Sequence, residues 1–220
     1  MTEHSKTNPP GAFAGVILLL ASVAAVIFVT HHPTLGSPGY ETIAQEAVAE
    51  AAFNGLVHGA LIIFALGYYY ALSVFSERLG ITQPAIRAAQ LAITIATATM
   101  VGAALVSGFV VPDTAAHFTS IEDDAMFRAQ LRTLGAANQV LAKTGTIAYG
   151  AAIFFWSVRL IAVQGVARAI GVIGCLAGAA LVVGIFSKRL ALDVHGMTVV
   201  LIIIGLWFSA IGALMIFRKL

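Results

Sequence analysis

The chain has 220 residues, of which 60% are hydrophobic and 10% are charged, and its formal net charge is +2. A soluble domain carries about 25% charged residues, so this composition excludes a water-soluble protein. The basic residues are scattered in ones and twos, which argues against nucleic acid as a partner. The single cysteine, Cys175, excludes a disulfide framework and a CxxC metal motif.

Six apolar segments are long enough to cross the hydrocarbon core of a bilayer, which takes about 20 helical residues. The first is longer than the apolar core of a signal peptide, and we interpret it as a retained helix. No long linker separates the segments. We therefore expect an all-α, polytopic integral membrane protein, with residues 1–220 forming one domain and one six-helix bundle. The predicted spans are 11–30, 53–75, 88–111, 135–158, 167–187 and 194–217.

Lys and Arg residues are unevenly divided between the two sides of this predicted bundle. Seven lie on the side of the two termini, and four lie on the opposite side together with eight Asp and Glu residues. Cytoplasmic loops are enriched in Lys and Arg. We expect both termini in the cytoplasm and the protein in a bacterial-type inner (plasma) membrane, surrounded by the lipid bilayer.

The two longer outer loops carry helical signals of their own. Residues 41–52 are rich in Ala and Glu, which favours a helix running directly into the second span. Ser120, followed by acidic residues, is typical of an N-cap, and we expect its helix to continue through Arg132 into the fourth span. Together these segments predict a small acidic cap over the outer surface.

One polar residue in each even-numbered span precedes a group of aromatic residues by about 10–13 positions. These polar residues are His58, Lys143 and His195. Aromatic side chains gather at membrane interfaces, so we assign the three groups to the inner interface and the three polar residues to one depth in the outer leaflet. The repeated spacing favours three related helical hairpins. The aromatic groups are Tyr68–Tyr70, Phe154–Trp156 and Trp207 with Phe208.

The odd-numbered spans are rich in small residues. The fifth contains Gly174 and Gly178 in a GxxxG pattern, and the third alternates small residues with threonines. Small residues let helices approach closely in lipid. We expect these surfaces to pack helices within the bundle, or to contact other membrane subunits or a second copy of the chain through Gly174 and Gly178.

His58, Lys143 and His195 are the candidate cofactor-binding residues, because an ionisable side chain within a span is costly and indicates function. A haem b held by His58 and His195 fits the requirement for one imidazole from each of two helices. A divalent metal held by His58, His195, Asp193 and His117 is chemically as reasonable. The sequence does not distinguish the two, since neither HExxH nor CxxC occurs.

Three functions remain open from these residues. The first is a haem- or metal-binding membrane protein acting in electron transfer or metal handling at the outer face. The second is a non-catalytic membrane subunit that packs against larger partners. The third is a small-solute transporter with Lys143 in its pathway, although no span is broken at mid-membrane by Gly and Pro, the usual sign of a transport site.

Overall fold

The computed structural model describes residues 9–33, 35–36, 39–118 and 120–218, and this part of the chain is helical without any strand. Six of its helical segments are long and apolar enough to cross a membrane, which confirms a multi-pass membrane protein. The third crossing is continuous over α4, a π-helix η1 and α5. The crossings are α1 (Pro9–Thr30), α3 (Ala51–Leu79), α4 (Pro84–Leu105) with η1 (Val106–Val110) and α5 (Val111–Ala115), α6 (Asp124–Ile161), α7 (Val166–Phe186) and α8 (Val194–Ile216).

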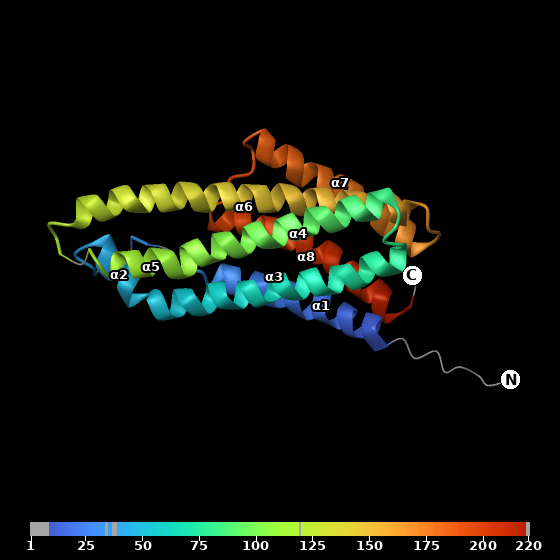
Figure 1. Ribbon diagram of the computed structural model, residues 1–220, viewed down its shortest axis with the longest axis horizontal. Coiled ribbons are helices and arrows are strands. Elements are labelled where there is room, and N and C mark those ends of the chain that lie inside the picture. Colours follow the sequence, from blue (N-terminus) through green and yellow to red (C-terminus); the bar gives the residue numbers. More distant parts are fainter. Residues whose placement is uncertain (1–8, 34, 37–38, 119, 219–220) are drawn as a thin grey trace.

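The crossing helices pack as a ring. Helix α1 lies against α3 and α8, α4 lies between α3 and α6, and α7 packs mainly on α6 with a smaller contact to α8. Figure 1 shows that α1 begins and α8 ends at the same end of the bundle, which we call the terminal end. The opposite end carries α2 (Ile43–Ala49) and α5, and we call it the cap end.

A layer of aromatic side chains fills the middle of the ring. Trp156 of α6 stacks on Trp207 of α8 with ring centres 6.1 Å apart, Phe75 of α3 packs edge-on against both, and Tyr68 packs on Phe208 at 4.9 Å. These rings are at most 4% exposed. The three aromatic groups therefore meet in the core of the bundle, whereas from the sequence we assigned them to an interfacial belt. The exposed members of the groups are Tyr69, Tyr70 and Phe154.

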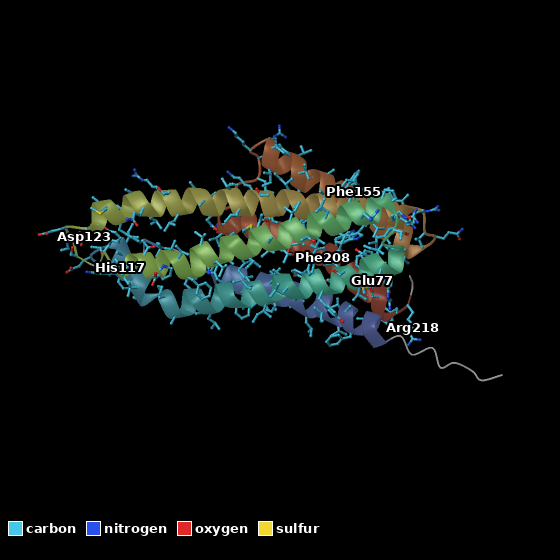
Figure 2. The ribbon with its side chains drawn as sticks, in the orientation of Figure 1. Glu77, His117, Asp123, Phe155, Phe208 and Arg218 are labelled. Atoms are coloured by element: carbon cyan, nitrogen blue, oxygen red, sulfur yellow. The ribbon has the colours of Figure 1, made fainter. Side chains whose placement is uncertain are left out.

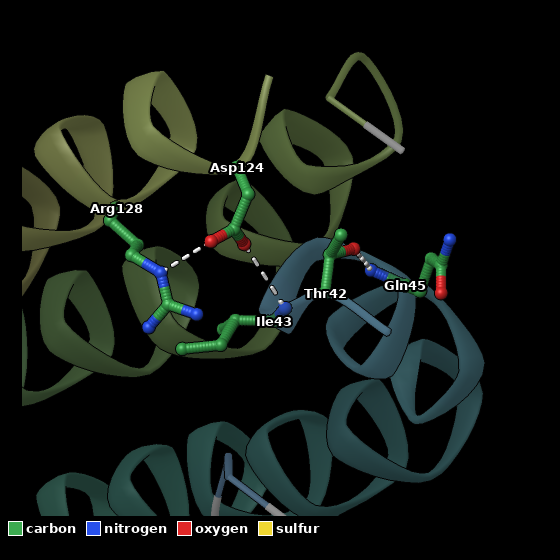
Figure 3. A network of polar contacts seen from close by, with 5 residues as sticks. All are labelled: Thr42, Ile43, Gln45, Asp124 and Arg128. Atoms are coloured by element: carbon green, nitrogen blue, oxygen red, sulfur yellow. Dashed lines mark hydrogen bonds and ion pairs between the residues drawn. The ribbon is translucent and has the colours of Figure 1, made fainter. Parts of the chain in front are cut away.

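The predicted cap is present and has a small core of its own, formed by α2, α5 and the first turns of α6. Its centre is Phe127, which is fully buried with Ala44, Ala47 and Ala115. Asp124 joins the parts, because its carboxylate accepts hydrogen bonds from the backbone N–H of Ile43 and from Arg128 (Figure 3). The cap is thus fixed to the start of α6.

Two details of the cap differ from the sequence-based expectation. A turn at Glu50 separates α2 from α3, so the second span is not one helix from residue 41 onward. Asp123, not Ser120, is the residue before the first turn of α6, and the Ser120 hydroxyl donates to its carboxylate at 2.6 Å. The helix does continue through Arg132 into the fourth span, as expected.

Glycines set the contact between α6 and α7. A Cβ at Gly178 would lie 2.5 Å from the carbonyl oxygen of Gly150, and one at Gly174 would overlap Ser157 and Trp207. Close approach of two helices in lipid requires such small residues. The GxxxG pattern therefore packs α7 within this chain, and contact of these glycines with other subunits or a second copy stays a prediction.

We expect Gly174→Leu and Gly178→Leu each to lower the free energy of unfolding by at least about 1–3 kcal/mol, because the larger side chain has no space against α6. Thermal unfolding of the purified protein in detergent measures the effect. Gly135→Ala on α6 is the control, since no atom lies within 4 Å of a Cβ placed there. Unchanged stability of both α7 variants would show that the two helices separate freely.

Candidate functional site

Helix length locates the cap end relative to a bilayer. A crossing of about 30 Å takes about 20 residues. The crossings range from 20 to 38 residues, and those of α3, α4–α5 and α6 are the longest. Counting about 20 residues from the terminal end, each helix leaves the hydrocarbon close to a polar residue. These residues are His32 after α1, His58, Ser107, Lys143, Lys188 after α7 and His195.

His58 lies inside the bundle at this level. It is 5% exposed, and its Nδ1 lies 3.0 Å from the backbone carbonyl oxygen of Asn54, one turn earlier in α3. The ring has space because residue 108 of the neighbouring crossing is a glycine. A Cβ at Gly108 would overlap the Cβ of His58 and lie 2.7 Å from its Cγ.

The π-helix η1 supports this arrangement from the third crossing. It contains Gly108 and Ser107. The backbone carbonyl of Ser107 points toward α3 and accepts a hydrogen bond from Asn54 Nδ2 at 2.8 Å. A π-helix leaves backbone groups off the regular α-helical pattern and is often found at functional sites. Here it fixes Asn54 and leaves space for the His58 side chain in the same contact.

His32 completes a histidine pair that the sequence did not suggest. It follows α1, where its backbone N–H donates to Val29, and its Nε2 lies 3.2 Å from Nε2 of His58. The loop beyond it is anchored at Gly36, whose N–H donates to the buried carboxylate of Glu46 at 2.6 Å. Two segments 26 residues apart are thereby joined through their imidazoles.

The hydrogen-bond partner of Nδ1 assigns the tautomer of His58. His58 donates from Nδ1 to a carbonyl oxygen, so in its neutral form its Nε2 is an acceptor, and Nε2 of His32 faces it. Nδ1 of His32 is buried without a hydrogen-bond partner among the described residues. Burial lowers the pKa of the His32 ring below its usual value of 6.5, and the backbone carbonyls of Pro33 and of His32 itself act in the opposite direction.

A cavity of about 250 Å³ lies between this pair and the aromatic layer, and we call it the deep chamber. Side chains from five crossings line it, and most of them are apolar. Its polar groups gather at two levels: Tyr68 and Tyr149 lie toward the aromatic layer, and His32, His58, Ser107, Asn138 and Asp193 lie toward the cap. The deep chamber is therefore amphipathic along the bundle axis.

A second cavity of about 150 Å³, the shallow chamber, lies on the cap side of the first. The two chambers share His32, Ser107 and Asn138 in their walls. The shallow chamber is also lined by Asn54 and by Glu50, the residue at the turn between α2 and α3. The shared residues therefore form a partition between a membrane-level space and a cap-level space.

The structure brings only one of the predicted site residues into this pocket as a buried side chain. His58 is buried, whereas Lys143, His195 and His117 are exposed. Asp193 lines the deep chamber, but its carboxylate caps α8 by accepting from the N–H of Gly196 at 2.8 Å. Among the described residues, no group of three His, Cys, Asp or Glu side chains could hold a metal ion.

The exposed position of Lys143 removes the need for a partner inside the bundle. Near a membrane surface, a Lys side chain typically extends its charged end to water while its stem stays in lipid. Figure 2 shows Asp123 and His117 at the cap end and Glu77 and Arg218 at the terminal end. His32 was missed as a site residue because a histidine in a loop carries no periodic signal.

Comparisons of the chain with protein-family models, with curated proteins and with solved structures find no match.

The contact between Gly108 and His58 makes a direct prediction. Gly108→Ala should lower the free energy of unfolding by about 1–3 kcal/mol, because the new methyl group has to displace the His58 ring or separate the helices. Gly59→Ala, one residue beyond His58, is the matched control, since the nearest atom to its Cβ lies 4.0 Å away. Thermal unfolding in detergent compares the two, and equal melting temperatures would contradict the tight contact.

Proposed function

We propose that this protein is a membrane-embedded binding protein whose deep chamber takes a small, mainly apolar molecule, with the polar end of that molecule at the His32–His58 pair. The observation that carries the proposal is the chamber itself, about 250 Å³ and polar at its cap-side end. An apolar cavity of about 150 Å³ is enough to bind benzene in another protein, so a larger ligand fits here. Ligand sites are typically apolar with a few placed polar groups.

The His32–His58 pair supports a second candidate, a divalent metal. Two ligand atoms held about 2.0–2.1 Å from one tetrahedral zinc ion lie about 3.3 Å apart, close to the 3.2 Å between the two Nε2 atoms. The bond from His58 Nδ1 to a carbonyl oxygen is the kind that orients metal-ligating histidines. Water would have to complete the coordination. A haem between His58 and His195 lacks comparable support, since His195 is exposed.

We further propose that the cap end faces the outside of a bacterial inner membrane and that both termini are cytoplasmic, as the distribution of Lys and Arg favours. Single cysteines in a Cys175→Ser background test this with a membrane-impermeant maleimide on whole cells. Ile121→Cys in the cap should be labelled directly, and Thr82→Cys at the terminal end only after permeabilisation. The reverse pattern would place the chambers on the cytoplasmic side.

Binding in the deep chamber is tested with 1-hexanol on the full-length protein in lipid nanodiscs. At about ten times its Kd, a ligand that binds only the folded state should raise Tm by about 3–6 °C. Ala142→Leu fills the chamber and should remove the shift, whereas Ala137→Leu on the exposed face of α6 should keep it. Zn²⁺ added in a parallel titration tests the metal candidate.

A second blocked variant distinguishes a filled chamber from misfolding of the Ala142→Leu protein. Ala65→Val, on the α3 wall of the deep chamber, gives a second blocked variant with a smaller change in volume. An equal hexanol shift in the wild type and in both blocked variants would show that hexanol acts through the lipid and would overturn the proposal. A shift with Zn²⁺ alone, lost in His32→Ala, would favour the metal.

A further inference from the structure

We infer that the ligand of these chambers is a cationic amphiphile, an organic ammonium whose charged head lies in the shallow chamber and whose apolar part lies in the deep chamber. This inference rests on the proposed binding function and specifies the chemistry of the ligand. It follows from an unpartnered acceptor of Asn54, which lines the shallow chamber, and from the charges that line the two cavities.

One acceptor beside the partition lacks a donor. Oδ1 of Asn54 is buried without a partner among the described residues, and its identity is fixed because the amide nitrogen donates to Ser107. A buried acceptor without a donor is costly. Asn54 lines the shallow chamber, so a head group in that chamber that carries N–H groups lies beside this acceptor.

The charges of the lining residues have one sign. The shallow chamber is lined by Glu50 and the deep chamber by Asp193, and among the described residues no Lys or Arg lines either cavity. The carboxylate of Glu50 makes no hydrogen bond or ion pair with a described residue. The hydrogen bonds of Glu50 are those of its backbone, at the turn before α3. An anionic head group would meet these carboxylates without compensation, whereas an ammonium group is attracted to them.

The geometry matches a molecule with two unlike ends. Glu50, the residue before α3, and Asn54 lie one turn apart on the same face, and both line the shallow chamber. The partition residues border both chambers, so a ligand that passes them reaches the apolar walls around Leu61 and Phe64.

Three probes with the same chain and different heads test the inference: n-hexylammonium chloride, 1-hexanol and sodium hexanoate. Each is titrated into the full-length protein in phosphatidylcholine nanodiscs, with the chamber-blocked Ala142→Leu variant as reference for partition into lipid. We expect the wild type to bind hexylammonium about tenfold more tightly than hexanol and hexanoate most weakly, because charge-assisted hydrogen bonds are the stronger ones.

Glu50→Gln should bring hexylammonium to within about threefold of hexanol, while Glu41→Gln, an exposed position before α2, should leave the preference intact. Unchanged hexanol binding by Glu50→Gln shows that this variant is folded. Equal binding of hexanol and hexylammonium by the wild type, tighter binding of hexanoate, or a preference that survives Glu50→Gln would each overturn the inference and leave the chamber proposal standing. Loss of all chamber-dependent binding would instead overturn the proposed function.

Discussion

The thickness of the bilayer sets a minimum length for every crossing helix, and the rest of this structure depends on that constraint. Lipid supplies no hydrogen bonds, so each crossing has to be a helix of about 20 residues. Helices α7 and α8 are close to that minimum with 21 and 23 residues, whereas α6 has 38. The surplus of α3, α4–α5 and α6 at the cap end builds the cap and the shallow chamber above the level at which the shorter helices end.

Within that frame, the size of side chains along the ring decides where space remains. Large aromatic rings such as Trp156, Trp207 and Phe208 fill the bundle on the terminal side of Tyr68. On the cap side several facing positions are alanines, which do not reach across the same distance. The deep chamber lies at this level, and the alanines that line it are Ala25, Ala65, Ala103, Ala104 and Ala142.

The sequence predicted the six crossings and the level of the polar residues, because hydropathy and spacing report position along a helix. It placed Lys143 and His195 in a shared site with His58 because spacing alone does not tell which way a side chain points. The helical period would have helped, since the buried residues of α6 recur every three or four positions and leave Lys143 beside them. His32 was out of reach, because the fold of a loop determines its approach to α3.

The histidine pair links these features across three crossings. His58 is held by a carbonyl oxygen on its own helix, and its Nε2 meets Nε2 of His32, which lines both chambers. Gly108 makes this possible, because a side chain at that position of η1 would occupy the space of the His58 ring. A glycine in the third crossing therefore lets the loop after the first crossing meet the second crossing through two imidazole rings, at the level where the two chambers adjoin.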